Sequence, residues 1–372
     1  MHIFKKEEQM NGAIIGCGNI AFFHARAYPQ VEKVRLVAVC DKNLHRARKI
    51  ASLAKNCQIF TDYKKMLKEV NNLDFVEVLT PHSTHLEIVK EIVKKGLSVN
   101  LQKVQTVTAK DYKEMLRICE KKKARLRVFE NFRYYQPYRF AKKLIDKSRI
   151  GQAERVQINK IGGSKWSQNY QYHWLRARKW RITQKENYSH PVLFDDGYHK
   201  HSLVEFFLGQ KITRVRSWCG YKNILPGLKI DSPAAVEYFT DRDAYGLFNT
   251  INTKMRIPHH FYPCDEEIEI VGTGGVIKIY GGHGLLFSEK NRSSIRQGVY
   301  LIDQKGKWQF FNSFDLDIRQ SFVAGLAEFV KFIKGDISEK DLIFNQEDAF
   351  QTLRIGLAII NSLKKNGRIV KV

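Results

Sequence analysis

Short apolar runs alternate with amphipathic stretches over the first third of the chain. The apolar runs have the length of buried parallel strands and lie at residues 13–15, 34–40, 73–79 and 97–101. Between them, apolar residues recur at three- and four-residue spacing, which is the pattern of a helix with one buried face. Residues 84–95 are one example, with Gly96 as the stop signal, and Thr61 and Thr108 are expected to cap two further helices. Strands that alternate with helices predict a parallel, doubly wound α/β sheet.

The pattern changes near residues 125–128, after which strand signals dominate. They lie at residues 153–161, 213–221, 234–240, 245–253, 266–271, 276–280 and 298–302. One helix is expected among them at about 198–208, and two more close the chain at about 321–334 and 347–364. Consecutive strands joined by short turns favour an antiparallel or mixed sheet. We therefore expect an α+β region with a large, mostly antiparallel sheet that leaves one face open.

The first apolar run passes directly into a helical pattern through residues 16–21, which read G-x-G-x-x-A. Gly16 permits the tight turn, Gly18 lets a pyrophosphate approach the backbone, and Ala21 lets the helix pack closely on the strand. Asp41 ends the second run, near the offset of roughly 20 residues at which a carboxylate binds the ribose 2′-hydroxyl. An ordinary strand–helix–strand unit with a chance glycine pair is the alternative. We favour a dinucleotide site for NAD, with NADP as the second choice.

These features predict an N-terminal Rossmann NAD(P)-binding domain over residues 1–126 and a C-terminal α/β domain over residues 127–372. Ligands of a doubly wound sheet bind beyond the carboxyl ends of its strands. The candidate cofactor-binding residues at these ends are Gly16, Gly18, Asn19, Ile20, Asp41, Thr80, His82, His85 and Gln102. Lys103 directly follows an apolar strand, so we expect its ammonium beside the cofactor, with an ordinary surface lysine as the alternative.

Composition narrows the class of protein. A length of 372 residues favours two domains over one. The net charge of +25 permits a polyanion partner, but the lysines are spread along the chain without a recognised nucleic-acid motif, so we expect a solvated basic surface. No apolar run approaches roughly 18 residues, so no membrane span is expected, and residues 1–10 lack the apolar core of a signal peptide. The six scattered cysteines indicate neither a zinc site nor disulfides and fit a reducing cytoplasm.

A second group of chemically capable residues lies at 195–201, which read D-D-G-Y-H-K-H. Asp195 and His199 share one face if a helix begins there. A carboxylate beside an imidazole positions it and supports its cationic form, which suits a proton acceptor. The spacing alone equally fits a helix-capping aspartate and a structural histidine, so both interpretations stay open.

The chain resembles the Gfo/Idh/MocA oxidoreductase family, which includes inositol and glucose dehydrogenases and glucose–fructose oxidoreductase. The resemblance covers nearly the full length. It rests on G-C-G-N-I-A at 16–21, Asp41, T-P-H-S-T-H at 80–85, G-L-S-V-N-L-Q-K-V at 96–104, N-F-R-Y at 131–134, D-D-G-Y-H at 195–199, I-E-I-V-G-T-G-G at 268–275, Ser321-Phe322 and Glu347-Asp348-Ala349.

The resemblance implies a nicotinamide between the two domains and a C-terminal open sheet that mediates a homodimer or homotetramer. It also implies that Lys103, Asp195 and His199 are the catalytic trio. The family's usual E-K-P reads Gln102-Lys103-Val104 here, so the lysine is kept while the glutamate and the proline are not. Gln102 can hydrogen-bond, but it carries no charge to tune Lys103 or the cofactor.

Residues 173–181 are unusually basic and aromatic and precede Asp195. In one interpretation Trp174 stacks on a sugar face and Arg178 holds a carboxylate or phosphate of the substrate. In the other, the segment is a basic surface loop with buried tryptophans. Arg133, in the N-F-R-Y segment, is a further candidate substrate residue.

We therefore expect a cytoplasmic NAD(P)-dependent dehydrogenase that transfers a hydride between nicotinamide and a secondary alcohol of a sugar, cyclitol or sugar derivative. A small, neutral or anionic substrate is the expected partner, without specific nucleic acid or membrane. One alternative is a non-catalytic nucleotide-binding sensor or scaffold on the same fold, which the changes at Gln102 and Val104 suggest. A polyanion- or RNA-binding protein is the other.

Overall fold

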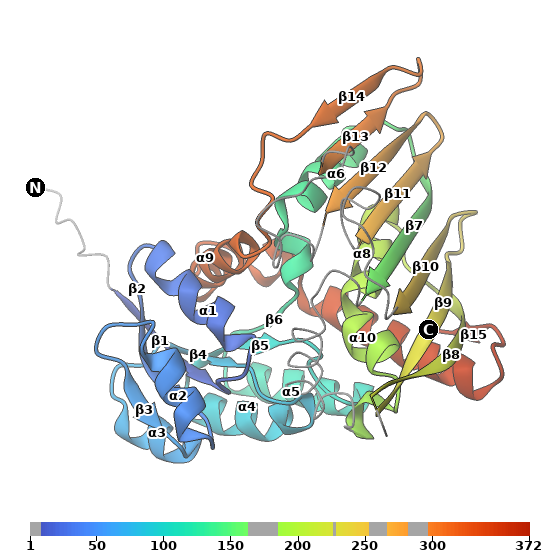
Figure 1. Cartoon of the computed structure of the whole chain (residues 1–372). Helices are drawn as coiled ribbons and strands as arrows, with labels where there is room; N and C mark the ends of the chain where they lie inside the picture. The colour runs from blue at the N-terminus through green and yellow to red at the C-terminus, as the bar shows by residue number, and fades with distance from the viewer. Residues whose placement is uncertain (1–8, 163–184, 226–227, 253–265, 282–296) are drawn as a thin grey trace, which may run out of the picture. The chain divides into compact units, whose positions relative to one another are not determined.

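The computed structural model describes residues 9–162, 185–225, 228–252, 266–281 and 297–372. Internal contacts divide the chain into two units, whose course along the sequence can be followed by colour in Figure 1. The first unit comprises Met1–Asn131 and Arg319–Phe350, and the second comprises Phe132–Ile318 and Gln351–Val372. Residues 319–350 therefore belong to the first unit although most of the second precedes them in the chain.

Six parallel strands form the sheet of the first unit. They are β1 (Met10–Ile15), β2 (Val34–Cys40), β3 (Gln58–Phe60), β4 (Phe75–Val78), β5 (Ser98–Gln102) and β6 (Leu126–Phe129), in the order β3-β2-β1-β4-β5-β6. All neighbouring pairs are parallel, which confirms the predicted doubly wound sheet. The strand order reverses at β1, between β2 and β4, and ligands of such sheets bind beyond the strand ends at this switch point.

Helices accompany the strands of this sheet. They are α1 (Ala21–Ala27), α2 (Leu44–Ala51), α3 (Tyr63–Glu69), α4 (His85–Lys94), α5 (Ala109–Lys121) and α9 (Gln320–Lys334), with short turns η1 (Tyr28–Gln30), η2 (His82–Thr84) and η7 (Glu339–Asp341). Although α9 comes from late in the sequence, it packs against α1, where the ring of Phe322 stacks on that of Phe23 with centroids 5.4 Å apart.

Two helix starts test the expected caps. Thr108 caps α5 as predicted, because its hydroxyl accepts a hydrogen bond from the backbone N–H of Asp111 at 3.1 Å. The helix predicted to be capped by Thr61 instead has Asp62 as its cap, and the Asp62 carboxylate accepts from the backbone N–H groups of Lys64 and Lys65 at 2.7 and 3.2 Å. An aspartate oxygen satisfies two otherwise unpaired helix donors, so the helix begins one residue later than Thr61 would place it.

Within the described residues, the sheet of the second unit has nine strands. They are β7 (Ala153–Gly162), β8 (Arg214–Leu225), β9 (Leu228–Phe239), β10 (Tyr245–Asn252), β11 (Glu266–Gly272), β12 (Gly275–Gly281), β13 (Gly298–Ile302), β14 (Trp308–Phe311) and β15 (Val370–Lys371), in the order β14-β13-β12-β11-β7-β10-β9-β8-β15. Only the β7–β10 pair among these is parallel. The mostly antiparallel sheet is thus confirmed, and it gains two edge strands, β14 and β15, that are too short to give a clear sequence pattern.

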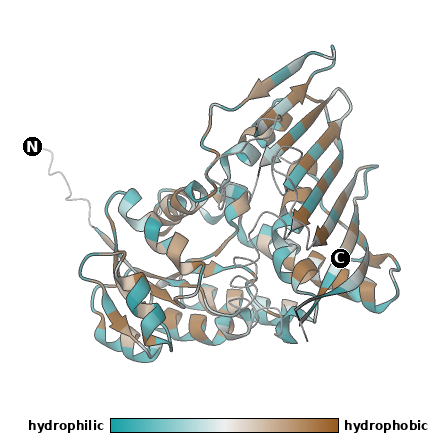
Figure 2. Ribbon diagram, in the orientation of Figure 1, coloured by the Kyte–Doolittle hydropathy of each residue, from teal (hydrophilic) through white to brown (hydrophobic). Residues whose placement is uncertain are grey.

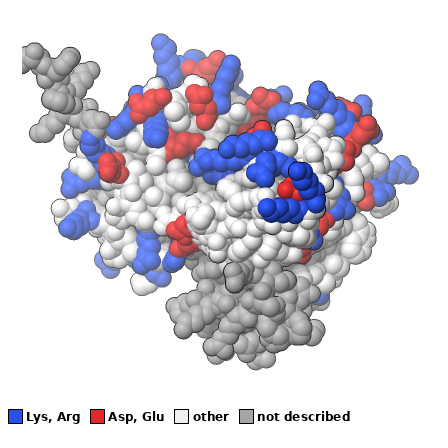
Figure 3. All heavy atoms as spheres, turned by 90° about the horizontal axis from the view of Figure 1, so that it is seen from above, with Lys and Arg blue, Asp and Glu red and all other residues white. Residues whose placement is uncertain are grey.

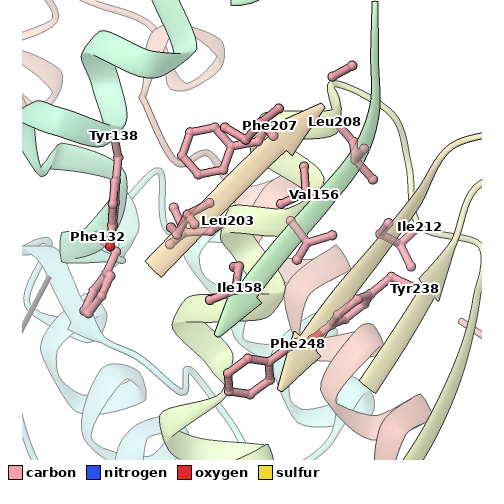
Figure 4. Close-up of a cluster of buried hydrophobic side chains, with 14 of the residues drawn as sticks. Phe132, Tyr138, Val156, Ile158, Leu203, Phe207, Leu208, Ile212, Tyr238 and Phe248 are labelled. Atoms are coloured by element: carbon pink, nitrogen blue, oxygen red, sulfur yellow. The ribbon is translucent and has the colours of Figure 1, made fainter. Parts of the chain in front are cut away.

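The core of the second unit lies between this sheet and three helices: α6 (Gln136–Asp146), α8 (Tyr198–Leu208) and the later part of α10 (Gln346–Lys364). Figure 4 shows Leu203 and Phe207 of α8 beside the β7 residues Val156 and Ile158, and all four are fully buried. On β7 and its neighbours, hydrophobic and hydrophilic residues alternate, as Figure 2 shows. One face of the sheet is therefore apolar and covered.

The opposite face of the same sheet carries charged side chains and partly exposed aromatic rings. Glu269 of β11 pairs with Arg155 of β7 and, at 2.8 Å, with Lys278 of β12. Trp218 and Trp308 are each 59% exposed. In Figure 3, Lys and Arg side chains on the visible face lie beside Asp and Glu side chains. Within the described ranges, no helix is both long and apolar enough to span a membrane.

The core arrangement predicts a stability difference between two leucines. Leu203→Ala, at a fully buried position, should lower the free energy of unfolding by about 2–5 kcal/mol because it leaves a cavity. Leu44→Ala is the control, since Leu44 is 42% exposed and its loss should change stability by less than about 0.5 kcal/mol. Urea unfolding monitored by circular dichroism measures both, and equal effects would contradict the assigned core.

Candidate cofactor and active site

The glycine-rich turn between β1 and α1 has a backbone that only glycine accommodates at its first position. Gly16 has φ +98°, and a Cβ atom there would lie 2.8 Å from the backbone of Leu79. A Cβ at Gly18 would meet no heavy atom within 4 Å, so the chain is open at this point. Asn19 is exposed and Ile20 is half-buried. The open backbone at Gly18 matches what a dinucleotide pyrophosphate requires, so these residues fit NAD.

Asp41 connects this turn to the start of α2. Its Oδ2 accepts from the backbone N–H of Cys17 at 2.7 Å, and its Oδ1 accepts from that of Asn43 at 2.8 Å. The carboxylate is half-buried and lies at the carboxyl end of β2, beside the glycine turn. A carboxylate oxygen has more than one lone pair, so Asp41 can accept ribose hydroxyls while it keeps both backbone bonds.

The loop after β4 is joined to the loop after β5 by a buried histidine. His85 is fully buried, and its ring nitrogens lie 2.8 Å from the carbonyl oxygen of Thr80 and 3.2 Å from that of Gln105. Burial lowers the pKa of His85 to about 4, so the imidazole is neutral at physiological pH. His82 is 6% exposed in η2 of the same loop. A neutral imidazole carries one N–H, so the ring donates to one of the two carbonyl oxygens and only contacts the other, at two strand ends where cofactor residues were predicted.

Gln102 and Lys103 end β5. The side chain of Gln102 is buried, and its Oε1 accepts from the backbone N–H of Lys103 at 2.8 Å. Its Nε2 lies 3.3 Å from Nε2 of His24 in α1. The peptide bond between Lys103 and Val104 is cis, and Val104 is fully buried. Gln102 therefore contacts the interior of the first unit and the main chain of Lys103.

In the second unit, Asp195 and His199 lie in two different helical segments. Asp195 is buried in η5 (Pro191–Asp196), a π-helix, and His199 is buried in the first turn of α8. Gly197 joins the two segments. The position requires glycine, because a Cβ there would come within 2.2 Å of the Leu193 carbonyl oxygen. Gly197 is also the N-cap of α8, with no side-chain capping bond. Asp195 therefore does not cap α8, which removes one of the two interpretations left open for it.

A buried carboxylate from β9 holds the start of the π-helix. The two oxygens of Asp231 accept from the backbone N–H groups of Val192 and Leu193 at 2.9 and 2.8 Å. These are donors that the first turn of a helix cannot satisfy internally. The contact fixes η5, and with it the backbone that carries Asp195.

The ring of His199 stacks on that of Phe132, with centroids 4.3 Å apart and planes inclined by 24°. The ammonium of the next residue, Lys200, lies 4.1 Å from the same Phe132 ring centroid. Lys200 is fully buried and forms an ion pair with Glu266, which also accepts a hydrogen bond from the Tyr138 hydroxyl. The Phe132 ring therefore packs against both His199 and Lys200. The buried Lys200 ammonium is stabilised by its carboxylate partner and by this ring, and the ring in turn supports the His199 imidazole.

The predicted site residues fall into two groups. The first unit contains Lys103 and the cofactor candidates, and the second contains Asp195, His199 and Arg133. Arg133 is 4% exposed, and its guanidinium lies 4.4 Å from the ring centroid of Phe206. Trp174 and Arg178 lie outside the described residues. The meeting of Lys103 with the other two members of the trio stays a prediction.

Several buried polar residues around these sites are not evident from the motifs. In the first unit they are Glu77, Asn100 and Arg127, whose signal is a charged or amide residue inside a mostly apolar strand run. In the second unit they are Asp231 and Glu266, which lie in strands with several polar residues and give no such signal. Only the strand register shows what each of them meets.

Asp231→Asn should flatten the dependence of stability on pH. Burial raises the pKa of Asp231 from 3.8 to about 7, and the N–H groups of Val192 and Leu193 offset only part of that rise. Between these values the folded protein binds more protons here than the unfolded chain. The contribution of Asp231 to stability is therefore complete at low pH and lost as the pH rises through about 7.

Urea unfolding from about pH 4 to about pH 8 measures the slope in the wild type and the variant. The variant should be less stable by about 1–3 kcal/mol at low pH. The NH₂ group of asparagine cannot accept a hydrogen bond, so one of the two backbone N–H donors loses its acceptor. If the free energy of unfolding depends on pH equally in both proteins, Asp231 is not the group that binds the extra proton in the folded state.

Comparisons with known proteins agree with this architecture. Residues 10–130 match the family model described as "Oxidoreductase family, NAD-binding Rossmann fold", and residues 138–278 match the "GFO/IDH/MocA C-terminal domain". A similar curated protein is the scyllo-inositol 2-dehydrogenase (NAD(+)) of Bacillus subtilis, 22% identical over 98% of this chain and 97% of its own. Another is the D-apiose dehydrogenase of Rhizobium rhizogenes, 22% identical over 77% of this chain and 78% of its own.

Solved structures show the same fold. An oxidoreductase from Agrobacterium radiobacter in complex with NAD+, L-tartaric acid and magnesium superposes with a TM-score of 0.78, 19% identity and coverage of 98% of both chains. A scyllo-inositol dehydrogenase from Lactobacillus casei with bound NAD(H) and scyllo-inositol gives a TM-score of 0.74 at 19% identity, over 98% of this chain and 99% of that chain.

The two family models together span most of the chain, and the first is that of an NAD-binding domain whose glycine turn and Asp41 are described above. NAD is accordingly the cofactor of the first unit. The chain belongs to the Gfo/Idh/MocA oxidoreductase family.

Proposed function

We propose that the protein is an NAD-dependent dehydrogenase that acts on a secondary alcohol of a sugar, a cyclitol or a derivative of either. One observation carries the proposal: this member of the family keeps Lys103, Asp195 and His199. Asp195 and His199 are buried, and each lies in a helical segment that contacts with other residues hold in place. The names of the Bacillus and Rhizobium relatives, which act on an inositol and on D-apiose, support this substrate class.

The proposed roles follow from the chemistry of each side chain. NAD, when bound, supplies the acceptor for the hydride. His199 takes the hydroxyl proton of the substrate in oxidation and returns it in reduction. Lys103 donates a hydrogen bond to the same oxygen, and Asp195 orients the substrate and His199.

The wider setting belongs to the same proposal. We place the enzyme in the cytoplasm, as a homodimer or homotetramer assembled through the second sheet, with no specific nucleic-acid partner. The functional division into a cofactor domain at 1–126 and a substrate and oligomerisation domain at 127–372 is likewise proposed. A substrate that carries a carboxylate or phosphate would also be compatible with the basic composition.

NAD should bind more tightly than NADP. The Asp41 carboxylate beside the glycine turn would repel a 2′-phosphate, and Lys42 and Arg46 lie close enough in sequence to soften that preference. Fluorescence titration of both cofactors measures the ratio, and Asp41→Ala should reduce it. Binding of NADP about tenfold more tightly than NAD, a difference of about 1.4 kcal/mol, would contradict the assignment.

The catalytic roles predict two losses of turnover on a substrate found by screening polyols, aldoses and nucleotide sugars with NAD and NADP. His199→Ala should lower kcat by about 10²–10⁴-fold because the proton acceptor is lost. Lys103→Met should lower it by about 10²–10³-fold because a donor to the reacting oxygen is lost. NAD affinity should stay near wild type in both.

His45→Ala is the matched control, since His45 is exposed on α2. Wild-type turnover in Lys103→Met would remove the lysine from the mechanism. Cofactor binding without turnover on any tested substrate would instead favour the sensor or scaffold function that Gln102 and Val104 suggest.

A further inference from the structure

Three polar side chains occupy neighbouring positions on the central strands of the first sheet. Glu77 of β4 pairs in register with Asn100 of β5, and Asn100 pairs with Arg127 of β6. The three are 1%, 2% and 1% exposed, within short strands whose interior residues are mostly apolar. Buried polar groups at this depth must hydrogen-bond to one another, so each contact determines how the next group is oriented.

The Arg127 end of this row has a single possible orientation. Nε and Nη2 of Arg127 donate to Oδ1 of Asn100 at 3.1 and 2.8 Å, and Nη1 donates to the Gly325 carbonyl oxygen at 2.6 Å. A guanidinium only donates, so the oxygen of Asn100 must face Arg127. The amide nitrogen of Asn100 then faces Glu77, to whose Oε2 it donates at 2.7 Å.

The other end begins at the main chain of Lys103. Its backbone N–H donates to Oε1 of Gln102, so the amide nitrogen of Gln102 must face Nε2 of His24, which is the acceptor at 3.3 Å. The proton of the neutral imidazole therefore lies on Nδ1, which donates to Oε2 of Glu77 at 2.5 Å. The rings of Phe129 and Phe322 pack edge-on against His24, with centroids 5.3 and 5.2 Å away.

Both series of donors converge on one carboxylate oxygen. Burial alone would raise the pKa of Glu77, but the hydrogen bond from His24 and the neighbouring Arg127 guanidinium hold it below its ordinary value. An ionised carboxylate only accepts hydrogen bonds, which is what two chains of donors require where they meet. The first unit therefore has an uninterrupted path of oriented hydrogen bonds from Arg127 to the main chain of Lys103.

We propose that Glu77 and His24 are positioning residues for Lys103, which they hold in place through Gln102. The proposal rests on the proposed function only in giving Lys103 a catalytic role. The resemblance to the family implies a carboxylate at position 102, directly beside the lysine. In this chain the carboxylate stands at position 77 instead, and His24 and Gln102 connect it to Lys103.

The first test needs no substrate. Long-range ¹H–¹⁵N correlation spectra of ¹⁵N-labelled protein report which histidine nitrogens carry protons, and the His24 signals are those missing in His24→Asn. We expect Nδ1 protonated and Nε2 bare at neutral pH. In Gln102→Glu a second acceptor-only group faces Nε2, so both nitrogens should carry protons. A proton on Nε2 of the wild type would overturn the path.

The second test separates positioning from general stability. Glu77→Met removes the acceptor, whereas Glu77→Gln keeps an oxygen that accepts both hydrogen bonds. Glu77→Met should speed hydrogen exchange of the Lys103 amide and lower kcat by up to about 100-fold, with the Kd for NAD unchanged. Glu77→Gln should restore slow exchange and most of kcat. Wild-type exchange and kcat in Glu77→Met would overturn the proposal.

A second pair of variants covers the case in which Glu77→Met does not fold. Gln102→Leu breaks the path beside Lys103. Gln105→Leu removes another buried glutamine, whose Nε2 donates to the Ala349 carbonyl oxygen at 2.6 Å outside the path. Only Gln102→Leu should accelerate Lys103 amide exchange and lower kcat; equal effects would contradict positioning.

The two proposals fail in different ways. If the wild type turns over no substrate, the proposed function fails, while the proton on His24 and the exchange of the Lys103 amide still decide the path. If the wild type is active but the broken path leaves kcat intact, the positioning role fails and the proposed function stands.

Discussion

A carboxylate that is buried without donors destabilises a fold by several kcal/mol, and this constraint shapes both units of the protein. Glu77 lies at the centre of the first sheet, and its Oε2 accepts hydrogen bonds from His24 of α1 and Asn100 of β5. The second unit has two further buried carboxylates. Asp231 accepts hydrogen bonds from the backbone of η5, and Glu266 accepts them from Lys200 and Tyr138. Each carboxylate needs its donors, so the segments that supply them are held in place.

These three carboxylates lie close in the hydrogen-bond network to the residues with proposed chemistry. Glu77 is connected to the main chain of Lys103 through two side chains. Asp231 binds the first turn of the π-helix that carries Asp195. Glu266 pairs with Lys200, the neighbour of His199 in α8. In each unit, a buried carboxylate therefore orders the backbone near a residue with proposed chemistry.

The departure from the family's E-K-P pattern has a structural context in the first unit. A carboxylate at position 102 would face Nε2 of His24, which accepts a hydrogen bond from the Gln102 amide. With Glu77 already on the other side of the ring, two carboxylates would require a proton on both ring nitrogens. Gln102 is therefore the residue type that agrees with Glu77, since its amide supplies both the donor and the acceptor that this position needs.

Local sequence pattern determined the parallel sheet, the glycine turn, Asp41 at the end of β2 and the start of α5, because each depends on residues within one or two turns of chain. It also located Lys103, Asp195 and His199 by motif. It did not determine that Arg319–Phe350 belongs to the first unit, that Glu77, Asn100 and Arg127 share one register, or that Asp231 binds the first turn of the π-helix that carries Asp195. Those contacts join residues far apart in the chain, and a buried polar group reveals its partner only when strand register and helix packing bring the two together.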